Sequence, residues 1–185
     1  PDEDTQIALL DVTEEVLASH GLRRYEVSNW SLPGRECRHN VNYWCNGTYL
    51  GFGAGAWSHV GGRRWGNVAD VVEYAARIAR AESPVGETEE LRGWAQAAET
   101  AMLYLRLVQG FEWKDLWARV EAEQRDTLRD RLMELAGDGL IVVDKDFVAP
   151  TRRGLLLLNQ IGIRLLGNDG PRESWAMPDE TAAGT

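Results

Sequence analysis

The second half of the chain carries one long apolar stripe at helical spacing, and this stripe constrains the fold more than any other feature. Between Thr88 and Gln109 the apolar positions follow one another at intervals of three and four residues, at Leu91, Trp94, Ala98, Met102 and Leu105. Such spacing places them on one face of a helix, which must be covered by other elements. Gly110 follows and is typical of a helix end. The pattern predicts a helix that forms the centre of a packed module.

The residues after this helix predict the elements that cover it. A short helix is expected over residues 113–119, and a longer one over residues 121–136 has leucines at positions 128, 132 and 135. Residues 140–143 and 147–149 are apolar runs separated by Asp144-Lys145-Asp146, which is typical of a β-hairpin. Thr151 can cap a last helix over residues 152–166. Helices followed by a hairpin and a helix predict a winged-helix-like helical module over residues 91–167.

The first half of the chain has a different pattern. Asp4 can cap a helix that ends near Ser19, and residues 24–29 are then expected as a strand. Residues 49–54 predict a second strand, which Gly61-Gly62 breaks, and Asn67 can cap a helix over residues 68–81. Helix followed by strand is the unit of an α/β layer. The chain is therefore expected to be an α+β protein in which residues 1–82 differ in architecture from residues 91–167.

Two segments are predicted to have no regular secondary structure. Residues 83–90 are polar and contain proline and glycine, which predicts a linker between the two parts. Residues 168–185 are rich in glycine, proline, serine, threonine and acidic residues, which predicts a disordered tail.

Charge and cysteine content exclude some classes of function. The net charge of −9 disfavours binding to nucleic acid, because neutralising phosphates requires a surplus of cations on the docking face. No apolar run approaches the roughly 20 residues of a membrane span. The charge therefore predicts a protein without nucleic-acid partners. The two cysteines lack the spacing of a disulfide framework, which favours a cytoplasmic protein.

One stretch is specific enough to indicate a family. It runs from Tyr25-Glu-Val-Ser-Asn-Trp through His39-Asn40-Val41-Asn42-Tyr43-Trp44 to Tyr49-Leu-Gly-Phe-Gly-Ala-Gly-Ala-Trp-Ser58. From about residue 1 to residue 166 the chain resembles the HemW-type haem chaperones, which belong to the radical S-adenosylmethionine (SAM) family and are related to oxygen-independent coproporphyrinogen III oxidase. The resemblance implies that residues 1–82 are the closing α/β units of a partial radical-SAM (TIM-like) barrel. It also implies a protein that binds haem and delivers it to haem-requiring enzymes associated with the membrane.

The cysteines depart from what this family needs. Its chemistry requires three cysteines in a Cys-x3-Cys-x2-Cys loop, which hold a 4Fe–4S cluster and leave one iron open for SAM. This chain has only Cys37 and Cys45. The resemblance therefore implies that the cluster and SAM belong to an N-terminal barrel portion of a longer protein. The chain alone is expected to be catalytically inactive, and whether the parent is an enzyme stays open.

The motif supplies the candidate site residues. The resemblance implies that His39 is a ligand of the haem iron, with Asn40 beside it and Tyr43 and Trp44 as a flat surface for the macrocycle. The alternative is that His39 and Asn40 are buried hydrogen-bonding residues that tie a strand end to a turn. The cysteines could ligate haem iron or simply fill apolar space.

Three further residues are candidates for contact with SAM. The resemblance places Gly53, Ala54 and Gly55 at a strand end against the SAM pocket. His59 is a possible second iron ligand, although a histidine in a water-facing loop is the simpler interpretation. Glu99 and Arg106 match an acid and an arginine of the family's C-terminal module, where an interhelical ion pair is expected.

Two rival functions stay open at this point. An oxygen-independent coproporphyrinogen III oxidase, a radical SAM oxidative decarboxylase, would use the same scaffold, and the His-Asn-x-x-Tyr-Trp motif favours the chaperone branch instead. A winged-helix nucleic-acid-binding protein would need a basic face on its recognition helix, and the candidate helices lack one.

Overall fold

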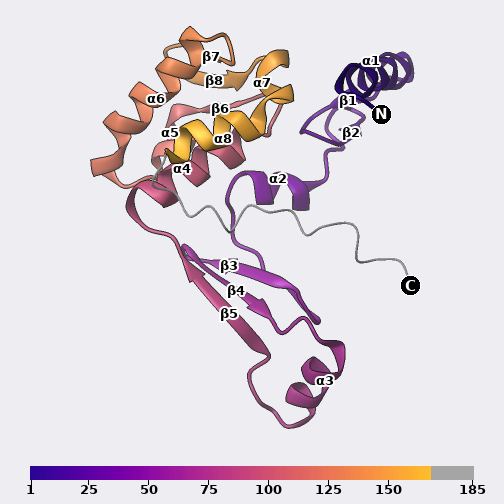
Figure 1. The fold of residues 1–185 in the computed structure, drawn as a ribbon, viewed down its shortest axis with the longest axis vertical. Helices are drawn as coiled ribbons and strands as arrows, with labels where there is room; N and C mark the ends of the chain where they lie inside the picture. The colour runs from indigo at the N-terminus through magenta and orange to yellow at the C-terminus, as the bar shows by residue number, and fades with distance from the viewer. Residues whose placement is uncertain (168–185) are drawn as a thin grey trace.

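The computed structural model describes residues 1–167, and its helices and strands form a mixed α and β fold with three visible parts (Figure 1). A group of helices with a small sheet is formed by the second half of the chain. A helix with a two-stranded ribbon lies at the N-terminus, and a longer three-stranded sheet extends away from both. The short helix α2, Arg38–Trp44, lies between these parts. The tail expected over residues 168–185 lies outside the described residues.

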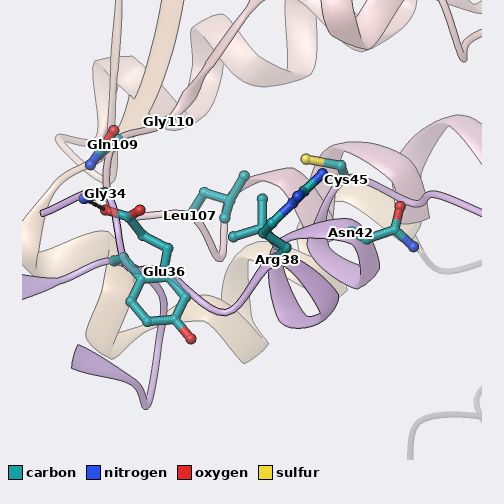
Figure 2. Close-up of a pocket in the computed structure, with 10 residues that line it drawn as sticks. Gly34, Glu36, Arg38, Asn42, Cys45, Leu107, Gln109 and Gly110 are labelled. Carbon is teal, nitrogen blue, oxygen red and sulfur yellow. Dashed lines mark hydrogen bonds between the residues drawn. The ribbon is translucent and has the colours of Figure 1, made fainter. Parts of the chain in front are cut away.

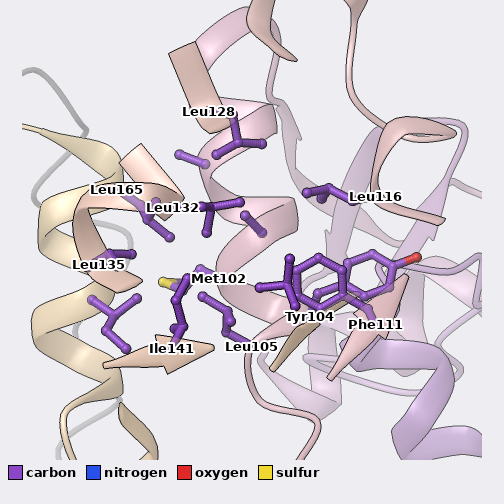
Figure 3. Close-up of a cluster of buried hydrophobic side chains, with 14 of the residues drawn as sticks. Met102, Tyr104, Leu105, Phe111, Leu116, Leu128, Leu132, Leu135, Ile141 and Leu165 are labelled. Atoms are coloured by element: carbon purple, nitrogen blue, oxygen red, sulfur yellow. The ribbon is translucent and has the colours of Figure 1, made fainter. Parts of the chain in front are cut away.

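The C-terminal part is built around α4, Gly93–Tyr104. The elements that follow it in the chain are β6 Phe111–Glu112, α5 Trp113–Trp117, the 3-10 helix η1 Ala122–Gln124, α6 Arg125–Gly137, β7 Ile141–Val143, β8 Phe147–Pro150, α7 Arg152–Leu156 and α8 Leu158–Leu166. The strands form an antiparallel sheet in the order β6-β8-β7. All buried members of the main apolar core lie between Ala97 and Leu165 (Figure 3). This part therefore has a core of its own.

The sequence predicted this part well, with two corrections. The hairpin of β7 and β8 is confirmed, and so is the cap at Thr151, whose hydroxyl accepts from the backbone N–H of Gly154 at 2.9 Å. The long helix was expected from Thr88 to Gln109, but α4 is shorter because β5 precedes it and a turn follows Tyr104. The last helix is interrupted at Leu157, which divides it into α7 and α8.

The N-terminal part consists of α1, Glu3–Ser19, and an antiparallel ribbon of β1, Arg23–Arg24, with β2, Trp30–Ser31. The cap of α1 is Asp2 rather than Asp4, because Asp2 Oδ1 accepts from the backbone N–H of Thr5 at 2.8 Å. The strand expected over residues 24–29 was wrong. Residues 25–29 instead form the turn of the ribbon, where the side chains of Ser28 and Asn29 donate hydrogen bonds to the carboxylate of Glu26.

The third part is an antiparallel sheet in the order β3-β4-β5, with β3 at Trp57–Val60, β4 at Arg63–Asn67 and β5 at Val85–Glu90. The helix α3, Val71–Ala79, lies at the far end of this sheet (Figure 1). The strand expected over residues 49–54 was wrong, since only an isolated bridge joins Tyr49 to His59. Gly61 and Gly62, with φ of 60° and 81°, make the turn between β3 and β4.

Two other expectations for this part were wrong. The cap of α3 is Asp70, which accepts from the N–H of Glu73, whereas the side chain of Asn67 donates to the carbonyl of Gly53. Residues 83–90 were expected to be a linker, but Val85–Glu90 form the edge strand β5. Ladder hydrogen bonds use the backbone, so a polar strand can pair without an apolar pattern. The division of the chain into two folding units at this point stays a prediction.

Among the helices of residues 1–167, none combines the length and the apolar character that crossing a bilayer requires.

Candidate functional site

The His-Asn-x-x-Tyr-Trp motif lies on the seven-residue helix α2, and its residues point in three directions. Residues four apart share a face of a helix. His39 and Tyr43 therefore share one face, and Asn40 and Trp44 share a second. The third face, with Arg38 and its neighbours, lines a pocket. The motif thus divides into an outward aromatic pair and an inward anchoring pair.

The outward face presents an exposed imidazole beside a row of aromatic rings. The ring of His39 lies edge-on to Tyr43, with centroids 4.8 Å apart. The ring centroid of Tyr43 lies 4.1 Å from that of Tyr49, and the centroid of Tyr49 lies 5.9 Å from that of His59. Burial raises the pKa of the Tyr49 hydroxyl. Chemically, this face offers a nitrogen ligand at the surface, held by an aromatic support.

The inward face fixes α2 to the rest of the molecule. The side-chain amide of Asn40 lies 3.5 Å from the hydroxyl of Tyr25, at the limit of a hydrogen bond. The guanidinium of Arg106 lies over the ring of Trp44, 4.9 Å from its centroid. The interpretation of His39 and Asn40 as a buried pair is therefore wrong for His39, which is exposed, and applies in part to Asn40.

The third face of α2 lines a pocket of about 670 Å³ (Figure 2). Arg38 and Asn42 contribute from the helix and Cys45 from the residue that follows it, and Tyr25 and Leu107 contribute from other segments. Burial raises the pKa of the Cys45 thiol, which disfavours the thiolate. None of His39, Asn40, Tyr43 and Trp44 lines this pocket. The candidate ligand and the pocket therefore belong to different faces of one helix.

His59 occupies a different environment from the water-facing loop that was expected. It lies in β3 with 7% of its surface exposed, and its Nδ1 is 2.9 Å from the carbonyl oxygen of Gly47. Burial lowers the pKa of this imidazole, more than the bond to Gly47 raises it. His59 borders a polar pocket of about 490 Å³ between the β3-β4 hairpin and α4. Burial therefore favours the neutral imidazole, and the contact with Gly47 places its proton on Nδ1.

The expected ion pair of Glu99 is present, but its partner differs. The buried carboxylate of Glu99 is paired with Arg64 of β4, so the pair joins a helix to a strand. Burial raises the pKa of Glu99, and the charge of Arg64 opposes that rise. Arg106 contacts Trp44 instead. The expectation of an interhelical pair was therefore wrong.

Gly53, Ala54 and Gly55 form a turn before β3. The N–H of Gly53 donates to the hydroxyl of Tyr74, its carbonyl accepts from Asn67, and the N–H of Gly55 donates to the carbonyl of Val68. Gly53 and Gly55 have φ of 109° and 68°, which favours glycine. A Cβ atom on Gly53 would have nothing within 4 Å, so its backbone is open to approach on that side.

The two cysteines do not fit a 4Fe–4S cluster. Cys37 and Cys45 stand at opposite ends of α2. Eight residues at about 1.5 Å each place them roughly 12 Å apart along the helix. Two thiolates cannot supply three ligands, and no group of three or more possible metal-ligating side chains occurs within residues 1–167.

Sequence reasoning missed the roles of Tyr49 and Arg106. The motif was not assigned to a helix, although its spacing of four between His39 and Tyr43 and between Asn40 and Trp44 is the spacing of a helix. This spacing would have placed His39 with Tyr43 on one face of a helix and Asn40 with Trp44 on another. The contact of Arg106 with Trp44 joins residues far apart in the sequence and had no local signal.

The chain is similar to several known proteins. Residues 91–157 match the family described as the HemN C-terminal domain. The chain is 36% identical over 167 residues to heme chaperone HemW of Mycobacterium tuberculosis H37Rv, which covers 90% of the chain and 41% of that protein. It is 32% identical over 167 residues to heme chaperone HemW of Bacillus subtilis, covering 90% of the chain and 44% of that protein.

A solved structure supports the fold. Coproporphyrinogen III oxidase (HemN) from Escherichia coli, described as a radical SAM enzyme, superposes with a TM-score of 0.67 at 17% identity, over 89% of this chain and 42% of that one. The chain spans about two fifths of the length of the curated relatives it matches. On these similarities, the chain belongs to the HemW-type family.

Proposed function

We propose that the chain is the C-terminal part of a haem chaperone and that it binds haem through the outward face of α2, with His39 as a ligand of the iron. The observation that carries the proposal is the exposed imidazole of His39, supported edge-on by Tyr43. The names of the similar proteins support haem as the cargo.

The chemistry of this face suits a haem ligand. Imidazole nitrogen is a common axial ligand of haem iron. An exposed ring can reach an incoming macrocycle, and the contact with Tyr43 limits its rotation. Tyr43 and Tyr49 add flat apolar surface next to the imidazole. In this proposal Asn40 and Trp44 hold the helix, and the haem then passes to haem-requiring enzymes associated with the membrane.

The cofactors of the full-length protein belong elsewhere. We propose that an N-terminal barrel portion holds a 4Fe–4S cluster and SAM, because two cysteines at opposite ends of α2 do not fit the cluster. Gly53, Ala54 and Gly55 are the contacts we propose for SAM from this chain. The apolar side chains of Leu9, Val12 and Val16 on α1 are exposed, and we propose that the barrel portion covers them.

We also propose a fold for each half of the chain and a cellular compartment for the protein. Residues 1–82 would be the closing units of the partial barrel, and residues 91–167 a winged-helix-like unit, which the confinement of the core to residues 97–165 supports. Two free thiols support a cytoplasmic protein.

Haem titration tests the proposal. His39→Ala should weaken haem binding at least about tenfold, or roughly 1.4 kcal/mol, and should remove the shift of the Soret band. His20→Ala is the matched control, because His20 is also exposed but lies at the end of α1. Cys45→Ser tests a thiolate ligand. Equal haem affinity of wild type and His39→Ala would refute the ligand, and selective loss in Cys45→Ser would transfer that role to the thiol.

A further inference from the structure

Three polar atoms without hydrogen-bond partners are buried where α2 meets the turn of residues 25–29 and the segment after α4. They are Oε2 of Glu26, Nε1 of Trp44 and Nε of Arg106. Backbone contacts hold the segments together, since Glu26 bridges to Leu107 and the N–H of Val108 donates to the carbonyl of Tyr25 at 3.1 Å. Unpartnered buried polar groups are rare in folded proteins, so their concentration here indicates a specific role.

Glu26 is the acidic member of this cluster. Its exposed surface is 0%, and its other oxygen, Oε1, accepts from the side chain of Asn29. Glu26 and Arg106 form no ion pair within the described part of the chain, although they are close enough for their charges to interact. Burial lowers the pKa of Arg106, and the negative charge of Glu26 opposes that effect.

Arg106 makes its direct contact with the ring of Trp44. The guanidinium lies 4.9 Å from the ring centroid, inside the roughly 6 Å range of a cation–π interaction. Such contacts are stronger where water is excluded, and Nε of Arg106 and Nε1 of Trp44 are both buried. Arg106 belongs to the segment that matches the HemN C-terminal domain, whereas Trp44 belongs to the motif helix.

The helix α2 depends on such contacts for its orientation. It has seven residues, none of them buried, and its N-cap Cys37 makes no side-chain bond to it. A helix this short is not stable without tertiary contacts. On the inward face, the bond of Asn40 to Tyr25 is long at 3.5 Å, which leaves the pair of Trp44 and Arg106 as the stronger contact.

We propose that Arg106 is a positioning residue for haem binding: through Trp44 it fixes the rotation of α2, and so the direction of His39, with Glu26 as its counter-charge. This inference rests on the proposed function of His39. The C-terminal unit would then set the direction of the outward face of α2 without touching haem.

The test combines haem titration with a measurement that does not depend on haem. Protein labelled with 5-fluorotryptophan gives one fluorine resonance for each tryptophan, and Trp44→Phe identifies the resonance of Trp44. Arg106→Gln should shift that resonance in the haem-free protein and weaken haem binding about tenfold. Arg106→Lys keeps the positive charge and should limit the loss to about threefold, so it carries the test if Arg106→Gln does not fold.

Arg129→Gln is the matched control. Its guanidinium lies over Trp113 at 5.4 Å, so this variant removes a similar contact within the C-terminal part. It should shift the Trp113 resonance and leave haem affinity unchanged. The proposal is overturned if Arg106→Gln leaves the Trp44 resonance in place or weakens haem binding no more than Arg129→Gln does. If His39→Ala binds haem normally, the proposed function fails, while the Trp44 resonance still reports whether Arg106 positions the helix.

Discussion

Nδ1 of His59 donates its proton to the backbone carbonyl oxygen of Gly47, at a distance of 2.9 Å. Gly47 follows the end of α2, so this bond ties the strand β3 to the segment that leaves the motif helix. The second ring nitrogen has no hydrogen-bond partner within residues 1–167, and burial lowers the pKa of the ring below its usual value near 6.5. The neutral form is therefore part of the folded structure.

The first prediction concerns acid stability. The unfolded chain protonates His59 near pH 6.5, whereas the folded chain resists protonation, so the unfolded state binds more protons below that pH. His59 should therefore reduce the free energy of unfolding as the pH falls below about 6.5. His59→Asn keeps a donor for Gly47 and removes the titration, so urea unfolding between pH 7 and pH 5 should show a weaker pH dependence. An unchanged profile in His59→Asn would contradict the assignment.

The second prediction concerns the buried pair of Arg64 and Glu99. Removing one partner of a buried ion pair costs about 3 kcal/mol or more, so Arg64→Gln should strongly destabilise the protein at pH 7. Without the arginine, the pKa of Glu99 rises further, while the unfolded chain ionises it near 4.5. The loss of stability should therefore grow as the pH rises above about 4.5. Thermal unfolding at pH 4.5 and pH 7 measures this difference.

The exposed pair of Arg80 and Glu82 provides the control for that experiment. Arg80→Gln should change stability little at either pH, because surface pairs contribute little. A similar loss in both arginine variants would show that the effect of Arg64 is not specific to burial.

The third prediction compares two helical glycines. A Cβ atom on Gly154 of α7 would lie 1.8 Å from the carbonyl oxygen of Leu140, whereas one on Gly137 of α6 would meet nothing within 4 Å. Gly154→Ala should destabilise the protein by about 2 kcal/mol, because the close approach of α7 to the backbone of Leu140 cannot be kept. Gly137→Ala should stabilise it by about 0.5 kcal/mol. Midpoints of urea unfolding measure both, and equal effects would show that α7 adjusts without cost.

The fourth prediction concerns folding units. Residues 91–167 produced alone should unfold cooperatively, because the buried apolar core lies within residues 97–165. Residues 1–90 alone should not, since α1 and α2 contain no buried residue. Circular dichroism during heating distinguishes the two fragments. A cooperative transition for residues 1–90 and none for residues 91–167 would reverse the proposed division.

The sequence predicted those elements whose cause is local. Leu128, Leu132 and Leu135 share one face of α6 and are all buried, and Thr151 caps α7 as its position before a helix indicates. Residues 85–90 could not be assigned in the same way. Their strand depends on pairing with β4, which lies about twenty residues earlier in the sequence, and polar side chains give no period of two to reveal it.

The sequence indicated which motif residues are neighbours but not the directions in which their side chains point. His39 and Tyr43 were named correctly as neighbours, because they are close in sequence and match a motif. The separation of Trp44 from them follows only once the segment is known to be a helix. The contact between Trp44 and Arg106 requires the whole fold.

The three directions of α2 limit how this segment can vary between related proteins. Each residue turns a helix by about 100°, so one residue inserted between His39 and Tyr43 would carry Tyr43 and Trp44 around the axis together. The aromatic partner would then leave the imidazole, and the indole would leave Arg106. Insertions in the loop before Cys37 have no such effect, because they leave the internal spacing unchanged. Length variation should therefore accumulate before the helix and be absent within it.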